Sequence, residues 1–486
     1  MSKEILSLQP ERVWKNFYAL TQIPRPSKSE EKIEAFMAKF GRDLGLETIV
    51  DEVGNVIVRK PATEGMEKCQ GVVLQGHLDM VPQKNSDTKH DFEKDPIDAY
   101  VEGDWVKARG TTLGADNGMG VAAIMAILES KDIPHGPIEA LFTSDEETGM
   151  TGAFGLKPGF LKGDILLNLD SEDEGELYVG CAGGVNGNFT FKFKDEAVPT
   201  GHVAYKLTVK GLKGGHSGLE IILGRGNSNK LMFRFFRHAT KEHGLRIASV
   251  DGGSLRNAIP RESFAVVTVP AAQADKFEAC VVKMKGVYQK ELSLVEPDLS
   301  FTVHKAEMPK TVIEHSAANR IINAIYGCPN GVIRMSDAMS GLVETSTNLA
   351  RVLSSEGKLI VQCLLRSSVD SAKDDLTEMI ASVFELAGAE VSFDGGYPGW
   401  KPDMNSLILN HMGKVYNKLY SKVPEIKAIH AGLECGLLGG VYPNWDMISF
   451  GPTIRFPHSP DEKINVPSVA KFWNFLVETL KSIPTK

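Results

Sequence analysis

The sequence lacks several features that mark large classes of proteins. Its six cysteines are widely scattered and form no Cys-x-x-Cys pair, which argues against structural zinc fingers and a disulfide framework and favours a reducing cytoplasm. It has no apolar run long enough to span a bilayer and no apolar signal core near Met1, so we expect neither a membrane anchor nor a secretion signal. Basic residues do not predominate either, because the net charge is -8, and this argues against a nucleic-acid partner.

What the sequence does contain is a regular alternation of structural patterns. At 486 residues the chain is too long for one ordinary hydrophobic core, so two or three domains are expected. Short apolar runs typical of buried strands lie at residues 71–76, 138–143 and 165–169, and helical apolar spacing spans 30–46 and 117–130. Helices between short buried strands favour an α/β domain with a mostly parallel sheet.

The pattern changes between about residues 201 and 394. The expected strands become longer and more polar, and amphipathic helices lie among them, which is typical of an α+β domain. The first pattern then returns. We therefore expect a two-domain α/β protein in which a discontinuous domain, residues 1–185 and 398–486, carries an inserted α+β domain, residues 186–397. Two runs of similar strand–helix–strand texture within the insert suggest a doubled unit.

Five short stretches end in residues of the types that bind divalent metal ions. Four of them follow or close an apolar run that reads as a buried strand, and ligands of α/β sheets collect beyond the carboxyl ends of the strands. The stretches can therefore converge although they are far apart in the chain. They are Gly76–Asp79, Gly114–Gly118, Ser144–Glu147, Asn168–Asp170 and Pro457–Pro460.

Each stretch taken alone has an ordinary explanation. His77 and Asp79 are also compatible with the polar end of an exposed strand, since short motifs match often. Asp116 precedes an expected helix and would serve as its N-cap. Glu146 and Glu147 are compatible with an acidic run on the surface. Judged from each stretch alone, both the structural and the metal-binding explanations stay open.

A further group of acids follows Asp170. Asp170 ends an apolar run that has no local reason to finish in a charge. We interpret the next acids, Glu172, Asp173, Glu174 and Glu176, as solvated surface and leave them out of the site.

Together the five stretches supply a complete set of donors for two divalent ions. The set contains two histidines, a potential bridging aspartate, a terminal glutamate and a terminal aspartate, and it leaves one glutamate uncoordinated. Sites with two metal ions about 3.5 Å apart hydrolyse amides and esters, and an uncoordinated carboxylate is suited to act as general base. The sequence therefore predicts a two-metal hydrolase.

Longer motifs around these residues are similar to those of a known family. The chain resembles the M20 metallopeptidases over its whole length, and within them the bacterial aminoacyl-histidine dipeptidases. The resemblance implies that the discontinuous domain is a dizinc catalytic domain and that the insert is a lid. The motifs are Gln75–Lys84, Arg109–Gly118, Asp145–Met150, Gly211–Gly218, Ile429–Gly436 and Gly451–Glu462.

The resemblance also implies roles for individual residues. It implies five metal ligands: His77 and Asp170 for one zinc ion, Glu147 and His458 for the other, and Asp116 as the bridge. Glu146 would act as general base and then as general acid, and Asp79 would orient His77. In the insert, His216 would stabilise the oxyanion, and three residues would bind the substrate: Asn257, Arg366 and Gly432.

The activity implied is hydrolysis of unblocked dipeptides, including Xaa-His dipeptides, with two divalent metal ions per subunit. Zinc is the expected metal, and cobalt and manganese also suit these donors. The alternative function is that of an M20 deacylase or aminopeptidase acting on N-acyl amino acids or longer peptides. A metal-binding protein without catalysis would lack the base or a ligand, and none is missing here. A homodimer is one possible assembly.

The length of the insert suggests a further hypothesis. In related two-domain enzymes the oxyanion histidine can come from the partner subunit, and here the insert is about twice the usual length. We hypothesise that its second half replaces the partner's contribution, so that each active site is complete within one chain.

Overall fold

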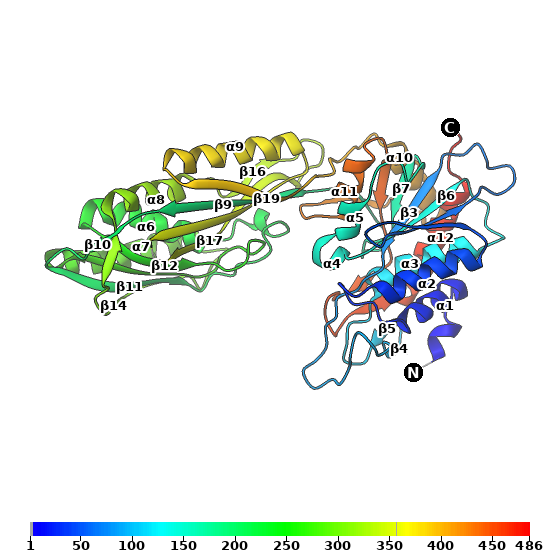
Figure 1. Ribbon diagram of the computed structural model, residues 1–486, viewed down its shortest axis with the longest axis horizontal. Coiled ribbons are helices and arrows are strands. Elements are labelled where there is room, and N and C mark those ends of the chain that lie inside the picture. Colours follow the sequence, from blue (N-terminus) through cyan, green and yellow to red (C-terminus); the bar gives the residue numbers. More distant parts are fainter. Residues whose placement is uncertain (1–2, 356) are drawn as a thin grey trace. The chain divides into compact units, whose positions relative to one another are not determined.

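The structure, a computed structural model, describes residues 3–355 and 357–486, and these fall into two units (Figure 1). Unit 1 comprises Met1–Gly180, Pro402–Ala428 and Leu433–Lys486, and unit 2 comprises Cys181–Lys401 and Ile429–Gly432.

The unit boundaries lie close to those expected from the sequence, after residues 180 and 401 instead of 185 and 397. One segment differs: residues 429–432, expected in the discontinuous domain, belong to unit 2. The reason is backbone pairing, because the Ala182 N–H donates to the carbonyl oxygens of Ile429 and Ala431 at 3.1 and 3.0 Å.

The short apolar runs of the first and last parts of the chain form the central sheet of unit 1, with strand order β1-β2-β6-β3-β7-β21-β8-β20. Neighbours among β6, β3, β7 and β21 are parallel, and the flanking pairs β1–β2, β2–β6 and β21–β8 are antiparallel. The mostly parallel sheet predicted from the sequence is confirmed. The strands are β1 Glu47–Val50, β2 Val56–Lys60, β3 Val72–His77, β6 Ile138–Thr143, β7 Ile165–Asn168, β8 Glu176–Cys181, β20 Glu425–Ile429 and β21 Asp446–Ser449.

Helix α3, Ala115–Glu129, is the central helix of unit 1. Its side chains from Asn117 to Leu128 are all buried, because it packs between β3 and α1 and is apolar on every face. None of the helices in the described ranges is long and apolar enough to cross a membrane. The other helices of unit 1 are η1 Lys3–Ser7, α1 Glu11–Thr21, α2 Glu31–Asp43, α4 Glu146–Gly149, α5 Thr151–Gly155, α10 Leu407–Tyr420, α11 Glu434–Val441 and α12 Val466–Lys481. A small second sheet contains β4 Ala99–Glu102, β5 Trp105–Ala108, β22 Ile454–Arg455 and β23 Lys463–Asn465.

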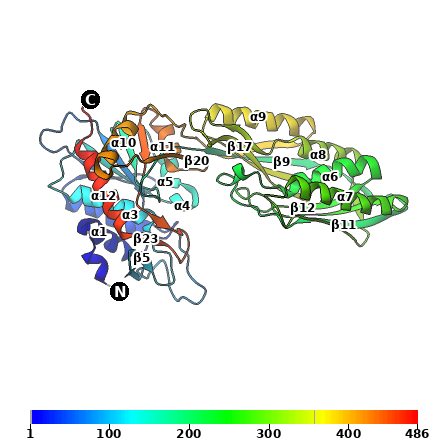
Figure 2. The same cartoon turned by 180° about the vertical axis from the view of Figure 1, so that it is seen from behind.

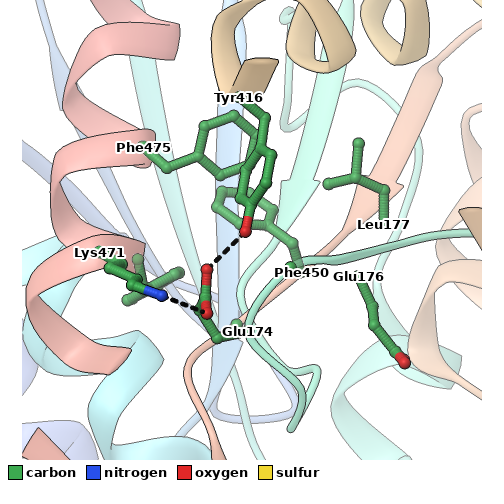
Figure 3. A pocket seen from close by; sticks show the side chains of 10 residues that line it. Glu174, Glu176, Leu177, Tyr416, Phe450, Lys471 and Phe475 are labelled. Carbon is green, nitrogen blue, oxygen red and sulfur yellow. Dashed lines mark hydrogen bonds and ion pairs between the residues drawn. The ribbon is translucent and has the colours of Figure 1, made fainter. Parts of the chain in front are cut away.

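Three of the four acids after Asp170 are not solvated surface, so that interpretation is wrong for Glu172, Glu174 and Glu176, whereas the side chain of Asp173 is 40% exposed and pairs with Arg455. Glu172, Glu174 and Glu176 are all half-buried. Figure 3 shows why for Glu174: its carboxylate accepts a hydrogen bond from the Tyr416 hydroxyl at 2.6 Å and pairs with Lys471 Nζ at 3.1 Å. These contacts tie the loop after β7 to α10 and α12.

Unit 2 is built on a nine-stranded sheet in which every recorded strand pair is antiparallel. Alternate residues of its strands, such as Leu207 and Val209 or Val361 and Cys363, share one core cluster with residues of α6, α7, α8 and α9. Because side chains alternate between the faces of a strand, the four helices cover one face of the sheet (Figures 1 and 2). The strands are β9 Gly183–Lys192, β11 His202–Lys210, β12 Arg246–Gly252, β13 Ser263–Pro270, β14 Ser300–Lys305, β16 Gly331–Met335, β17 Val343–Ser355, β18 Lys358–Ser367 and β19 Glu390–Tyr397, and β10 Asp195–Ala197 pairs with β15 Thr311–Ile313 outside this sheet. The helices are η2 Ile221–Leu223, α6 Ser228–His243, η3 Ala271–Gln273, α7 Ala274–Glu291, α8 His315–Gly327 and α9 Asp370–Leu386.

The strand order of this sheet repeats itself in reverse. Along the sheet the order is β14-β11-β13-β12 and then β17-β18-β9-β19. In chain order the first set is β11-α6-β12-β13-α7-β14, and the second is β9-α8-β17-β18-α9-β19. Numbered within each set, the orders are 4-1-3-2 and 2-3-1-4, and the two sets meet where β12 pairs with β17.

Candidate metal centre

The sheet of unit 1 brings three of the five sequence stretches to one edge, at the carboxyl ends of β3, β6 and β7. Strand β3 ends at His77, β6 is followed by the acids from Asp145, and β7 is followed by Asp170. Since β6, β3 and β7 are parallel neighbours, their carboxyl ends lie side by side. The loop carrying Asp116 and the one carrying His458 complete the group.

Asp116 lies between two histidines. His77 Nε2 is 3.1 Å from one carboxylate oxygen of Asp116, and His458 Nε2 is 3.2 Å from the other. His77 is also 3.3 Å from Asp170, and His458 is 2.9 Å from Glu147. The result is two clusters of potential metal ligands that share one carboxylate. Asp116 has extended φ/ψ before the regular part of α3, but both of its carboxylate oxygens face histidines and no backbone N–H of the described residues donates to them, so Asp116 does not act as an N-cap.

The donors fit two divalent cations. Glu147 Oε1 and Asp170 Oδ1 are buried and accept no hydrogen bond from the part of the chain that the structure describes, so each has a lone pair available for an ion. Carboxylate and imidazole are donors that zinc and related metals accept.

The pKa values of the two histidines also indicate a site that favours positive charge. Hydrogen bonds with Asp116 and Glu147 raise the pKa of His458 to about 11. Burial lowers the pKa of His77, but the charge of Asp170 and the bonds with the neighbouring carboxylates outweigh it, so its pKa is raised well above the ordinary value. The surplus of negative charge that holds a proton on each imidazole would also stabilise a metal cation in its place.

Glu146 differs from its neighbour Glu147 in making no ion pair with a histidine of the described residues, although it lies within 4.8 Å of His77. It begins the short helix α4, and burial, followed by the charges of Asp170, Glu434 and Glu147, raises its pKa well above the ordinary value although His77 opposes this. A carboxyl group in such surroundings takes up a proton readily, which is the property required of a general base.

Asp79 fixes the backbone at Glu146 and Glu147 through two hydrogen bonds. One of its carboxylate oxygens accepts from the Glu146 N–H at 3.0 Å, and the other accepts from the Glu147 N–H at 3.2 Å. The first oxygen also lies 3.2 Å from His77 Nδ1, within ion-pair distance but outside hydrogen-bond geometry. Although burial raises its pKa, His77 and the hydroxyl of Ser27 hold the pKa of Asp79 at about 2, so the carboxylate stays ionised.

Sequence reasoning missed two buried residues that support the Asp116 loop. Glu462, four residues after His458, accepts from four successive backbone N–H groups, those of residues 113–116, at 2.7–3.2 Å. Arg25 donates to the carbonyl oxygens of Leu78 and Asp79 at 2.9 and 2.8 Å, and also to that of Gly114. Glu462 belongs to one of the motifs quoted above, but an acid in a loop gives no sign of burial, and Arg25 lies outside all of the motifs.

Sequence reasoning also missed Glu434, which is the first residue of α11 and lies near enough to His77 and Asp170 for their charges to act on it. Its side chain is 1% exposed and accepts from Gln75 Nε2 at 2.6 Å and from the Thr143 hydroxyl at 2.9 Å. Burial raises its pKa to about 7. Gln75 is in turn bonded to Asn168, so buried polar groups connect the ends of β6, β3 and β7.

The remaining residues singled out from the sequence lie in unit 2. His216 Nδ1 accepts from the N–H groups of Gly218 and Leu219 at 3.1 and 3.0 Å, which leaves its Nε2 available for a proton or a ligand. Burial, followed by the charge of Arg366, lowers the pKa of His216, so the ring is neutral at pH 7. The backbone of Asn257 accepts from the Ser217 N–H at 2.8 Å, which places Asn257 beside this loop.

Arg366 and Gly432 are linked through one tyrosine. Arg366 is 5% exposed and donates to the Tyr397 hydroxyl at 3.0 Å, whereas its Nε has no acceptor among the described residues. A Cβ on Gly432 would come within 3.1 Å of the Tyr397 ring, so the segment can approach the ring this closely only without a side chain. Of the predicted residues of unit 2, Arg366 and Gly432 thus lie at Tyr397, and His216 and Asn257 share one loop region.

Comparisons with known proteins identify the family of the chain. The model of peptidase family M20/M25/M40 matches residues 73–482. The chain belongs to this family. It is 47% identical over 483 residues to the cytosol non-specific dipeptidase of Escherichia coli K12, covering 99% of this chain and 100% of that protein. The crystal structure of the aminoacylhistidine dipeptidase from Vibrio alginolyticus is similar with a TM-score of 0.96 at 50% identity, covering 100% of both chains.

A structure of low sequence identity shares the fold. The structure of the aminopeptidase PepT from Bacillus cereus is similar with a TM-score of 0.58 at 16% identity, and 98% of each chain is covered. The resemblance drawn from the sequence is confirmed, and the chain is a peptidase of the M20 family with a two-unit α/β fold.

Proposed function

We propose that this chain is a metal-dependent dipeptidase that hydrolyses unblocked dipeptides, Xaa-His dipeptides among them. The observation that carries the proposal is the carboxylate of Asp116, which is shared by the clusters His77–Asp116–Asp170 and Asp116–Glu147–His458. Glu146 lies beside them, within 4.8 Å of His77 and Glu147, and makes no ion pair with a histidine of the described residues. The full-length similarity to two proteins named as dipeptidases supports this substrate class over acyl amino acids or longer peptides. The E. coli relative is named a cytosol enzyme, and we propose the same location here.

Five side chains would hold the metal ions. His77 and Asp170 would bind one ion, Glu147 and His458 the other, and Asp116 would bind both. When bound, the two ions supply positive charge that stabilises the transition state and lowers the pKa of a water molecule towards neutrality. Zinc fits these donors best, and cobalt and manganese fit them as well.

Proton transfer would be the task of Glu146. Its carboxylate removes a proton from the attacking water and then hands that proton to the amine that leaves. Asp79 would hold this residue in place through the backbone of α4 and keep the His77 ring oriented.

Unit 2 would recognise the substrate. Arg366 would pair with the free carboxylate of the dipeptide, because its guanidinium is buried and Nε still has donor capacity. His216, through Nε2, would donate to the developing oxyanion. Asn257 and the backbone at Gly432 would complete the substrate contacts. Because Arg366 would hold the free carboxylate at a fixed place relative to the bond that is cleaved, the length of the peptide would be limited.

We also propose that the insert is a duplicated unit and that each active site is complete within one chain. The mirrored strand order of the sheet in unit 2 supports the duplication. A mixing experiment tests the second point. Combining Glu146→Ala subunits with His216→Ala subunits should restore no activity, whereas recovery of activity would show that subunits exchange these groups.

The substrate class is tested with a panel of dipeptides, tripeptides and N-acetyl amino acids. We expect turnover of dipeptides by the metal-loaded enzyme and little turnover of the other two classes. Preference for tripeptides or N-acetyl amino acids would instead establish the aminopeptidase or deacylase alternative.

A further inference from the structure

A second group of metal-binding side chains lies in unit 2 and has no part in the proposed reaction. His238 and His243 are on the last turns of α6, and Cys280 is on α7. One ligand atom from each of the three lies within 4.8 Å of the others. All residues of the metal centre described above belong to unit 1, so this cluster is a separate one.

The chemistry of the cluster suits a borderline or soft metal ion. A thiolate and two imidazoles are donors that zinc accepts, at about 2.3 Å from sulfur and about 2.0 Å from nitrogen. A tetrahedral ion with such bonds needs its ligand atoms about 3.5 Å apart. Side-chain rotation closes the remaining gap, since each of these residues turns about one or two bonds, and His238 is exposed.

Two other observations favour a cation here. His243 Nδ1 is buried and has no hydrogen-bond partner in the described ranges, as a nitrogen that lacks its ligand would be. His243 is also the last residue of α6, where the helix dipole places partial negative charge. Burial raises the pKa of the Cys280 thiol, Lys283 opposes this and Glu242 adds to it, so a bound cation would have to displace the thiol proton.

We propose that His238, His243 and Cys280 form a third, non-catalytic metal site that binds a divalent ion such as Zn²⁺ and fastens the end of α6 to α7. The exposed His238 leaves a route from solvent, and water completes the coordination. Binding displaces the thiol proton to solvent and forms a metal–sulfur bond, with no change of oxidation state. The side of the sheet on which α6 and α7 pack would be stabilised by the ion.

Cobalt(II) provides a specific readout, because thiolate-to-cobalt charge transfer absorbs in the near ultraviolet and no cysteine belongs to the dinuclear centre. Enzyme already loaded with two zinc ions is titrated with Co²⁺, and bound metal is counted by elemental analysis. We expect a charge-transfer band that saturates at one cobalt ion per chain. Cys280→Ser should abolish the band, and His238→Ala should weaken Co²⁺ binding at least about tenfold. The matched control His315→Ala, an exposed histidine on α8, should change neither.

Absence of the band in the wild-type enzyme would overturn the proposal, and so would a band that survives in Cys280→Ser. Asp116→Asn, which should disable the dinuclear centre, provides an independent arm. It should keep the band, and loss of the band there would mean that the cobalt ion reports the catalytic site.

Discussion

The metal centre of unit 1 and the Arg366 cluster of unit 2 are both polar and largely buried, but they are assembled differently. The metal centre takes its residues from the ends of neighbouring parallel strands and the loops beside them. The Arg366 cluster, which comprises His216, Asn257, Arg366, Tyr397 and Gly432, takes its residues from the ends of long strands, a Gly-rich loop and a four-residue segment that returns from late in the chain. The first kind of site follows from strand order, and the second depends on tertiary contacts. The two should therefore respond differently to mutation.

The largest effect is expected at Glu146. Glu146→Gln removes the proton acceptor and keeps the shape, so kcat should fall by about 10²–10⁴-fold. Metal content should stay near two ions per chain because this side chain is not among the proposed ligands. His458→Ala is the contrast, since it should lose metal as well as activity. Both quantities are measured by steady-state kinetics and elemental analysis, and turnover at the wild-type rate in Glu146→Gln would rule out its role.

Arg366 should matter to the substrate and not to the metal. Arg366→Ala leaves the substrate carboxylate without its partner, at a cost of about 2–5 kcal/mol, which corresponds to a loss of roughly 30-fold to several thousand-fold in kcat/KM. A dipeptide amide, which has no terminal carboxylate, should lose far less. The control Tyr397→Phe keeps the charge and should have a small effect. An equal loss for dipeptide and amide would contradict the carboxylate contact.

Glu462 should act on the metal through the loops that it joins. Glu462→Ala leaves four backbone N–H groups without their acceptor, and we expect metal affinity to fall by about 10–100-fold, as when other groups that position ligands are removed. Asp461→Asn is the matched control, because Asp461 is exposed and adjacent. Competition with a fluorescent chelator measures the affinity, and equal values for the two variants would show that Glu462 does not position the ligands.

The smallest effect concerns His430, a buried neighbour of Arg366 whose Nε2 lies 2.7 Å from the Ser346 hydroxyl oxygen. Burial, followed by the charges of Arg366 and His216, lowers its pKa to about 3. The folded protein therefore keeps this ring neutral, whereas the unfolded chain protonates it below its ordinary pKa of about 6.5. The resulting stability is fully present above pH 6.5 and is lost as the pH falls, by at most about 1.4 kcal/mol per pH unit.

His430→Asn should remove this contribution. The free energy of unfolding of the variant, measured in urea between pH 6.5 and 5, should depend on pH less steeply than that of the wild type. Parallel curves for the two proteins would show that His430 does not titrate in this way.

Much of unit 1 could be predicted because its strands are short, apolar and wholly buried. The expected strand 138–143 coincides with β6, and the expected helix 117–130 differs from α3 by two residues at one end and one at the other. Strand ends in a parallel sheet are neighbours by construction, which is why the grouping of His77, Asp170 and the acids from Asp145 could be expected.

The other features of the fold and the site depend on contacts between residues far apart in the chain, which the local sequence pattern does not reveal. Strand β17 was not expected, because residues 344–348 are five consecutive polar residues that are nonetheless buried. The burial of Glu462, Arg25 and Glu434 arises from partners far away in the chain. In unit 2 the roles of Arg366 and Gly432 came from family resemblance alone, since an arginine at the end of a strand is ordinarily exposed.

The most direct test of the dinuclear centre is a titration of activity against bound metal. Chelated enzyme carrying Cys280→Ser, which removes the additional site proposed above, is reconstituted with zinc while dipeptide hydrolysis and bound metal are measured together. The activity should reach its plateau at two zinc ions per chain and should be absent without metal. Full activity at one ion per chain, or hydrolysis by the metal-free enzyme, would contradict a reaction that depends on two ions sharing Asp116.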